Sequence, residues 1–211
     1  YVYGINVETS APTSIGIFNS IKTSNNFING NEDLENIHVA ISGVGKVGSK
    51  LAKLLFTAGT KVSAASINPE LIKELKKEVK INEIDPKNLY KIRCDIISPC
   101  ALGGIINSST KDQLKCKAIV GAANNQLDNS ETGEWLLKNN IVYAPDYLVN
   151  SGGVIAIASE INETENLLEK QLEKISDRLR LVLEESKKNN ESTDSVAKRI
   201  AWERINASKT N

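Results

Sequence analysis

The sequence of 211 residues shows no excess of charge of either sign, because 26 lysine and arginine side chains are balanced by 26 acidic ones. A nucleic-acid-binding protein normally carries a basic excess, so this balance argues against that class. Long apolar runs are also missing, since none reaches the roughly 18 residues that a membrane helix needs. The first residues show no basic segment followed by an apolar one, as a secretion signal would. We therefore expect a cytoplasmic protein with no nucleic-acid partner and no membrane partner.

Histidine and cysteine are scarce. His38, the one histidine, lies inside a predicted strand, so we expect a structural role for it and no histidine-based acid–base chemistry. The three cysteines, Cys94, Cys100 and Cys116, match neither paired metal-binding spacing nor a dense disulfide framework. We expect free, packed thiols and no metal site.

Methionine is absent altogether, so the sequence has no initiator residue and begins at Tyr1. We expect either that the start has been removed by processing or that the sequence is a piece of a longer protein.

Short apolar, β-branched segments alternate with amphipathic ones from about residue 37 onward. The predicted strands are 37–42, 61–66, 94–98, 117–122 and 141–145. The intervening segments have apolar residues three or four positions apart, as helices do, at 47–59, 69–79, 111–117 and 132–140. Alternating strands and helices are typical of βαβ units. The sequence therefore predicts an α/β fold with a doubly wound parallel sheet of five strands.

Further helices are predicted on both sides of this core. One is expected at 12–23, followed by a polar loop at 24–36. The region 151–211 contains three more, at 152–160, 166–188 and 194–205. The C-terminal region thus adds helices beyond the sheet.

Apolar residues along 166–188 recur at alternating intervals of four and three, at Leu168, Leu172, Ile175, Leu179 and Val182. Such spacing suits a coiled-coil seam between subunits. It also suits a helix that packs onto its own domain. We expect the second arrangement, and we expect Trp202 in the last helix to pack onto the body of the protein as well.

A glycine-rich loop follows the first predicted strand and precedes a helix. It contains Gly43, Gly45 and Gly48, with Lys46 and Val47 between the last two glycines. This G-x-G-x-x-G spacing in this context is typical of a dinucleotide site, in which the helix N-terminus meets the pyrophosphate. A purely structural glycine turn is the alternative. We expect one dinucleotide-binding domain over residues 1–211, with a Rossmann-like core at about 37–150.

The second predicted strand ends on Ser66, where a dinucleotide fold usually has an acidic residue that binds the adenosine ribose. A serine can still bond to a hydroxyl, and it does not repel a phosphate as a carboxylate would. We expect NAD as the cofactor and leave NADP open, because the only basic residues nearby are Lys61, Lys73 and Lys76. A site that has drifted and binds either cofactor weakly is the alternative.

Three longer motifs are more specific than the glycine loop. They are "CDIISPCALGGIIN" at 94–107, "IVGAANNQL" at 119–127 and "IVYAPDYLVNSGGVI" at 141–155. Together with "APTSIGIF" at 11–18 and "AKRIAWERI" at 197–205, they closely resemble the amino-acid dehydrogenases of the leucine, valine and phenylalanine type. The resemblance implies reversible oxidative deamination of a branched-chain or aromatic L-amino acid to its 2-keto acid, with NAD(P).

The resemblance also implies roles for residues on the cofactor side. Thr13 and Asn124 are similar to residues that hold the nicotinamide, and Cys100 and Ala101 to a turn beside the cofactor ribose. Each has a plainer alternative, because threonine is common at helix starts and asparagine in turns. We expect Cys100 to pack rather than to act as a nucleophile.

On the substrate side, Asn125 matches an asparagine that faces the amino acid, and Asn150 is expected to line the cleft before a glycine pair. Val154 and Ile157 resemble the apolar wall that receives a branched side chain, although a buried core helix would have the same pattern.

The sequence departs from the family at three of these places. The family usually has Asp where Ser66 stands, and Asn and Asp on the cleft side where Ala156 and Ser159 stand. The first departure weakens the expected cofactor preference, and the others alter the expected substrate side.

The lysines and the aspartate that carry the family's proton chemistry belong to an N-terminal domain, and no such glycine–lysine motif is present outside the dinucleotide loop. We assign no catalytic residue and expect the chain to bind dinucleotide without turning over an amino acid by itself. The alternative is a non-catalytic nucleotide-binding or interaction module, as a homo-oligomer or with a partner chain. A different Rossmann oxidoreductase is a third reading.

Overall fold

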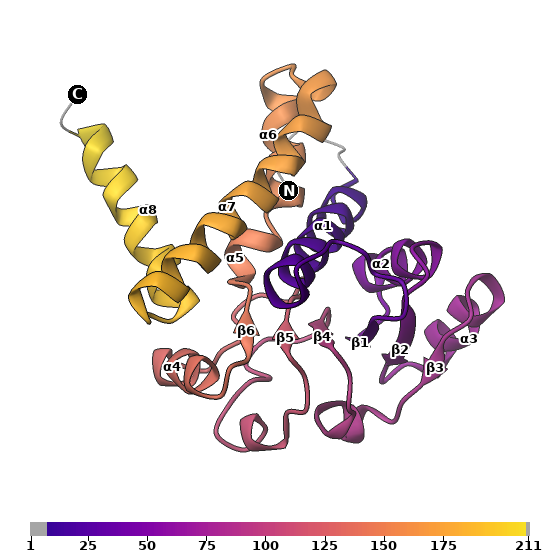
Figure 1. Ribbon diagram of the computed structural model, residues 1–211. Coiled ribbons are helices and arrows are strands. Elements are labelled where there is room, and N and C mark those ends of the chain that lie inside the picture. Colours follow the sequence, from indigo (N-terminus) through magenta and orange to yellow (C-terminus); the bar gives the residue numbers. More distant parts are fainter. Residues whose placement is uncertain (1–7, 210–211) are drawn as a thin grey trace.

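A parallel sheet forms the centre of the computed structural model, which describes residues 8–209 (Figure 1). Within these residues the sheet has six strands in the order β3-β2-β1-β4-β5-β6, and every neighbouring pair is parallel. The strands are β1 (His38–Ser42), β2 (Lys61–Ala65), β3 (Asn82–Glu83), β4 (Ile96–Pro99), β5 (Ala118–Ile119) and β6 (Val142–Tyr143). The predicted doubly wound α/β fold is confirmed.

The register of the sheet aligns the ends of its central strands. Ser42 of β1 pairs with Ala65 of β2 on one side and with Pro99 of β4 on the other. The chain order reverses between β1 and β4, and open α/β sheets bind ligands outside the carboxyl ends of the strands at such a point. The loops after these strands are therefore the first place to look for a site.

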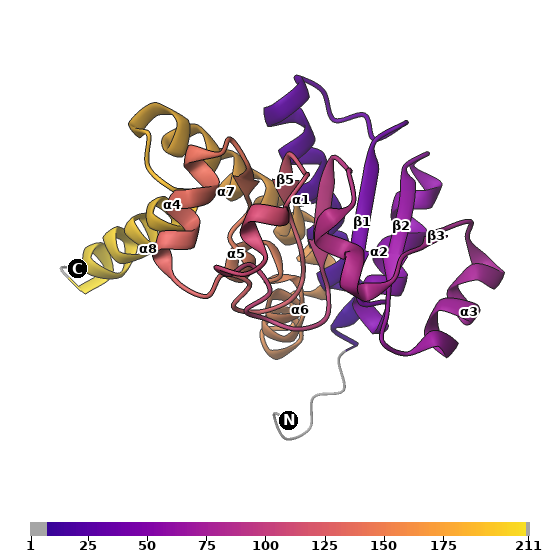
Figure 2. The same ribbon diagram turned by 90° about the horizontal axis from the view of Figure 1, so that it is seen from below.

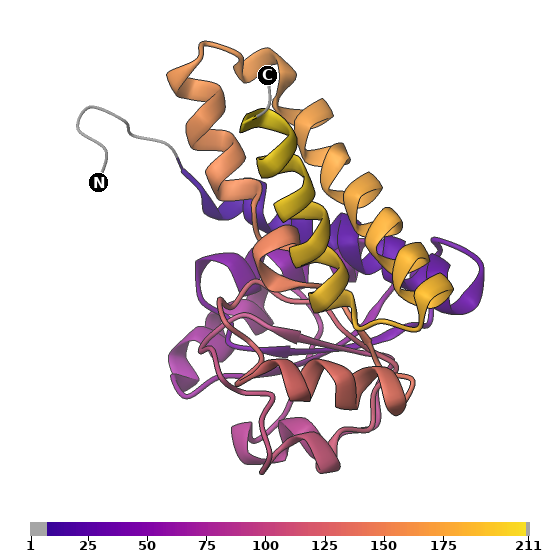
Figure 3. The same cartoon turned by 90° about the vertical axis from the view of Figure 1, so that its left-hand side faces the viewer.

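Helices cover both faces of the sheet. The α-helices are α1 (Ser10–Asn29), α2 (Lys46–Thr57), α3 (Pro69–Glu78), α4 (Ser130–Lys138), α5 (Asp146–Val149), α6 (Gly152–Ile161), α7 (Leu168–Asn189) and α8 (Thr193–Lys209). Side chains of α1, α2, α3 and α7 share one buried cluster with one face of the sheet. The opposite face packs against the 3₁₀ helix η1 (Pro86–Lys91) and α4. Figure 3 shows these layers above and below the sheet.

Three predictions of secondary structure were wrong. β3 was missed because both of its residues are polar and exposed at the sheet edge. Residues 111–117 form only the short 3₁₀ helix η2 (Lys111–Gln113), after which the backbone turns extended at Leu114. The predicted loop at 24–36 is helical as far as Asn29, because the buried side chain of Asn25 donates hydrogen bonds to the carbonyls of Asn31 and Asp33 in the turn that follows.

The apolar stripe of α7 packs within the chain. Ile175 and Leu179 are fully buried, and Leu179 shares a cluster with Ile17 and Ile21 of α1. Gly16 of α1 allows this approach, because a β-carbon there would lie 3.0 Å from Cδ1 of Ile175. The expectation that α7 lies on its own domain is confirmed.

The C-terminal helix extends away from the sheet. Figures 1 and 2 show α8 and α3 at opposite ends of the molecule. Trp202 is 61% exposed, so the expectation that it packs onto the body was wrong. No helix within residues 8–209 is both long enough and apolar enough to cross a membrane.

Truncation of Leu179 tests the packing of α7 on α1. We expect Leu179→Ala to lower the free energy of unfolding by about 2–5 kcal/mol, because a fully buried leucine leaves a cavity. Leu181→Ala on the same helix is the matched control and should change it by about 0.5 kcal/mol or less, since Leu181 is 41% exposed. Urea unfolding of both variants measures the difference, and equal losses would contradict the assigned packing.

Candidate functional site

The glycine loop joins β1 to α2 through close backbone contacts. Gly43 has φ of 90°, in the left-handed region that favours glycine. A β-carbon on Gly48 would overlap the carbonyl oxygen of Gly43, so only glycine lets the helix start sit on the strand end. A β-carbon on Gly45 would meet no atom within 4 Å. The first and third glycines thus serve packing, while the second faces open space.

The start of α2 offers unbonded amides beside this open space. The hydrogen bond from Ser49 N to Gly45 O, at 3.0 Å, spans its first turn, and no side chain caps the helix. The first amides of a helix have no intrahelical partner, so those of Lys46 and Val47 are available to an anion. Lys46 is exposed and adds a positive charge. This arrangement fits a pyrophosphate group.

The turn after β4 lies directly on the glycine loop. The amide of Cys100 donates to the carbonyl of Ser42 at 2.7 Å. The β-carbon of Ala101 lies 2.6 Å from where a β-carbon on Gly43 would be. Cys100 and Ala101 are therefore beside the glycine loop, and their predicted place beside the cofactor ribose stays a prediction.

Ser66 follows β2 at the same edge, since the preceding carbonyl, that of Ala65, accepts the amide of Gly43 at 2.8 Å. Its hydroxyl accepts a hydrogen bond from the amide of Asn68 at 3.1 Å. Nothing within residues 8–209 accepts the hydroxyl proton, which can therefore be donated to a ribose oxygen. Lys61 lies at the other end of β2, while Lys73 and Lys76 are paired with acidic side chains. None of these three lysines offers Ser66 a free positive charge.

A second group of predicted residues lies after β5 and β6. The side-chain amide of Asn150 donates to Oδ1 of Asn124 at 2.6 Å and to the carbonyl of Ala122 at 3.3 Å. This bond fixes the orientation of the Asn124 amide and leaves its N–H donors for a ligand. Asn125 is left-handed, with φ of 52°, and its carbonyl accepts the amide of Gly104 at 2.6 Å. The loop after β4 thus joins the glycine loop to the turn formed by Asn124 and Asn125 (the asparagine turn).

The starts of α1 and α6 complete this edge. A β-carbon on Gly152 would overlap the carbonyl of Pro12, and one on Gly153 would lie 2.9 Å from the hydroxyl of Thr13. Thr13 does not cap α1, because its hydroxyl donates back to the carbonyl of Thr9 at 2.8 Å. The structure thus brings Thr13 against the glycine pair that follows Asn150.

Val154 and Ile157 lie farther along α6. Val154 is 70% exposed and Ile157 is half-buried. Because they are not fully buried, the plain core-helix interpretation does not describe them, and they present an open apolar surface.

Sequence reasoning did not single out Gln126 and Asp146, although both stand in the quoted motifs. Gln126 is fully buried and Asp146 is 5% exposed, and the carboxylate accepts the amide of Gln126 at 2.7 Å. The available signal was a polar side chain inside an otherwise apolar segment, which in a buried position requires hydrogen-bonding partners.

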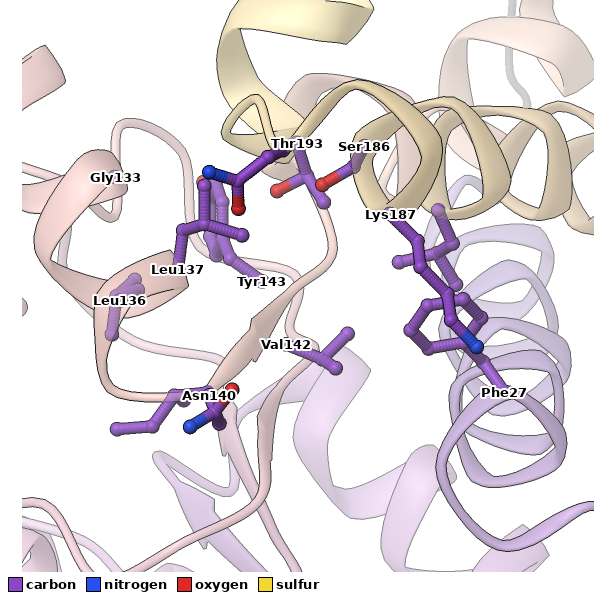
Figure 4. A pocket seen from close by; sticks show the side chains of 13 residues that line it. Phe27, Gly133, Leu136, Leu137, Asn140, Val142, Tyr143, Ser186, Lys187 and Thr193 are labelled. Atoms are coloured by element: carbon purple, nitrogen blue, oxygen red, sulfur yellow. The ribbon is translucent and has the colours of Figure 1, made fainter.

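A cavity of about 360 Å³ lies elsewhere (Figure 4). It is lined mainly by α4, the residues entering β6, and α7, including Leu137, Asn140 and Lys187. Asn140 precedes β6, so the cavity is at the amino edge of the sheet and contains none of the predicted site residues. It is separate from the carboxyl-edge arrangement.

Comparison with known proteins identifies the family of this chain. The family model described as Glutamate/Leucine/Phenylalanine/Valine dehydrogenase matches residues 67–210. The chain belongs to this family. It is 41% identical over 207 residues to phenylalanine dehydrogenase of Thermoactinomyces intermedius and 38% identical over 212 residues to leucine dehydrogenase of Geobacillus stearothermophilus. These matches cover 96% and 97% of this chain but only 56% and 58% of the two relatives.

A solved structure of the family shows the same fold. The crystal structure of L-tryptophan dehydrogenase from Nostoc punctiforme superposes with a TM-score of 0.92 at 35% identity, covering 97% of this chain and 62% of that one. The chain therefore corresponds to somewhat more than half of the family proteins that it matches.

Two departures from the family pattern have a different meaning in the structure. Ala156 and Ser159 are buried, and the hydroxyl of Ser159 donates to Gln171 of α7 at 3.1 Å. The expectation that they lie on the cleft side was wrong. The hydroxyl of Ser159 thus joins α6 to α7.

The cysteines and the histidine take no reactive form here. All three cysteines are free, and burial raises the pKa of the Cys100 thiol. Burial, with the nearby Cys116 and Asp95, raises the pKa of the Cys94 thiol to about 12. His38 lies in β1, and its ring contacts the hydroxyl of Ser63 at 2.8 Å, which agrees with a structural role.

The raised pKa of Cys94 predicts a loss of stability at alkaline pH. An unfolded thiol ionises above about pH 8.5, whereas the folded one keeps its proton to about pH 12, so the native state binds more protons in between. Stability should therefore fall as pH rises through this range. We expect the urea midpoint to drop less between pH 7 and about pH 10 in Cys94→Ala than in the unsubstituted chain, and equal drops would contradict this.

Proposed function

We propose that this chain is the cofactor-binding part of an NAD(P)-dependent amino-acid dehydrogenase. The reaction would be the reversible oxidative deamination of a branched-chain or aromatic L-amino acid to its 2-keto acid. One observation carries the proposal. The loop with the open position at Gly45 and the turn with the oriented amide of Asn124 lie at the same edge of the sheet, and hydrogen bonds join them through the loop after β4. When bound, NAD(P)⁺ would supply the hydride acceptor.

The loops after β1, β2 and β4 would hold the adenosine and pyrophosphate side. The amides of Lys46 and Val47 would donate to the phosphates at the positive end of the α2 dipole. The hydroxyl of Ser66 would bond to the adenosine ribose, and Cys100 with Ala101 would line the passage toward the nicotinamide ribose. NAD is the expected cofactor, and the absence of a carboxylate at Ser66 leaves NADP as the alternative.

The loops after β5 and β6 and the start of α1 would hold the reacting side. Thr13 and the free N–H donors of Asn124 suit the nicotinamide carboxamide, which offers both a donor and an acceptor. Asn125 and Asn150 would face the amino acid, and Val154 with Ile157 would contact its side chain. The 70% exposure of Val154 supports a pocket whose other wall comes from outside these residues.

Proton transfer would need groups that these loops do not supply. Lys46 is the one lysine among the assigned residues, and it lies in the phosphate-binding loop. The family resemblance places the catalytic lysines in a further domain, so the chain alone would bind the cofactor without catalysing deamination. A homo-oligomer or a partner chain as the natural assembly stays a prediction.

Calorimetric titration of the chain with NAD and NADP tests the cofactor site. We expect binding of NAD, and we expect Ser66→Asp to raise the ratio of NAD to NADP affinity by about tenfold or more, because a carboxylate accepts ribose hydroxyls and repels a 2′-phosphate. An unchanged ratio would show that Ser66 does not contact this ribose. Failure of the unsubstituted chain to bind either cofactor would contradict the proposal.

A turnover assay tests the need for further groups. The chain with NAD and leucine, valine or phenylalanine should form no NADH above the buffer rate, while a full-length leucine dehydrogenase serves as the positive control. Formation of NADH by the chain alone would contradict the assignment of catalysis to residues outside it.

A further inference from the structure

Asp146 is a buried carboxylate that no basic side chain within residues 8–209 neutralises. Its Oδ2 accepts the amide of Gln126 at 2.7 Å and the hydroxyl of Tyr143 at 3.1 Å. Burying a carboxylate without a cation is costly, and a pure packing position would be filled better by an apolar residue. The two groups that donate hydrogen bonds to this carboxylate therefore indicate its role in the structure.

The buried side chain of the first partner, Gln126, forms hydrogen bonds that stabilise the asparagine turn. Its side-chain Nε2 donates to the carbonyls of Gly121 and Ala123 at 2.8 and 2.9 Å. Because both acceptors are carbonyls, the nitrogen must be the atom that faces them. Asn124 and Asn125 lie between these anchored carbonyls and the amide of Gln126 that Asp146 holds.

The turn adopts a specific conformation. Asn125 is left-handed, which asparagine adopts more readily than most residues with a side chain. Its carbonyl must point to Gly104, and the carbonyl of Gln126 to the amide of Ile106 at 3.0 Å. The turn is thus the link through which the loop after β4 is held.

Residues at both ends of helix α5 contact the same turn. Asp146 is its first residue, and Asn150 directly after it donates to Asn124. A single helical turn is not stable alone, so α5 depends on its burial through Val149 and on these contacts. The carboxylate of Asp146 and the amide of Asn150 together fix where the two asparagines stand.

We propose that Asp146 is a positioning residue that acts through Gln126 to hold Asn124 and Asn125 in the geometry that the cofactor and substrate require. This inference rests on the proposed function. Because Asp146 is only 5% exposed, it would act without contacting either ligand. Small displacements of groups that orient a reacting pair can cost a factor of about a hundred in rate, so a residue behind the turn can control the site.

The main test compares Asp146→Asn with the unsubstituted chain. The variant keeps the shape but loses the charge and one acceptor oxygen. We expect the dissociation constant for NADH to rise at least about tenfold. We also expect hydrogen exchange at the amides of Gly104 and Ile106 to speed up by a similar factor in the ligand-free chain, although neither amide touches Asp146, while β1 stays protected.

Two matched variants isolate the effect. Asp128→Asn makes the same change two residues after Gln126 and should leave NADH binding unchanged. Within residues 8–209 the Asp128 carboxylate accepts the hydroxyl of Thr132, at 2.5 Å, and no other hydrogen bond. Tyr143→Phe removes both bonds of the Tyr143 hydroxyl, which donates to Oδ2 of Asp146 at 3.1 Å and accepts the amide of Asp146 at 3.3 Å. It keeps the bond from Gln126 and should change binding far less than Asp146→Asn.

Unchanged exchange at Gly104 and Ile106 in Asp146→Asn would overturn the inference, as would faster exchange with unaltered NADH binding. If Asp146→Asn fails to fold, Gln126→Met removes the two Nε2 bonds while keeping the carboxylate of Asp146. It should speed up hydrogen exchange at the amides of Gly104 and Ile106, and unchanged exchange there would overturn the inference equally. If the unsubstituted chain binds no NADH, the proposed function fails, and the exchange result alone decides whether Asp146 holds the turn.

Discussion

A β-carbon on Gly48 would overlap the carbonyl oxygen of Gly43, so the first turn of α2 can sit on the end of β1 only where this side chain is missing. The same constraint recurs where Gly152 of α6 meets the carbonyl of Pro12 in α1. These two backbone contacts bring helix starts from distant parts of the chain to the carboxyl edge of one sheet. The free amides of α2 and the hydroxyl of Thr13 are at this edge because the glycines allow it.

Different interactions hold the two halves of the candidate site. The glycine loop and the turn after β4 are joined by backbone bonds and close packing, including that from Cys100 N to Ser42 O. The asparagine turn depends on buried polar side chains, chiefly Gln126 and Asp146. Buried polar groups cost desolvation and specify a geometry through the bonds that they make, although Oε1 of Gln126 is buried without a partner within residues 8–209. Orientation matters most on the half where, by our proposal, the chemistry takes place.

Membership in the family and the partial coverage of its members fit together. The chain matches relatives over nearly its whole length but spans 56% and 58% of theirs. The apolar surface at Val154 is open, and no lysine other than Lys46 stands among the assigned residues. These observations support the proposal that the chain supplies the cofactor-binding side of the site.

The sequence by itself determined the central strands and the glycine loop, because periodicity and glycine spacing are local signals, and the resemblance of its longer motifs indicated the family and the loops of the candidate site. It could not reveal β3, whose exposed polar residues carry no pattern, nor the length of α1, which depends on Asn25 reaching the turn after the helix. Only the tertiary structure decided that Ser159 bonds to α7, that Asn150 orients Asn124, and that Asp146 stands behind the asparagine turn. These facts join residues twelve to twenty-six positions apart, and such pairings exist only once the chain has folded and buried polar groups must find partners.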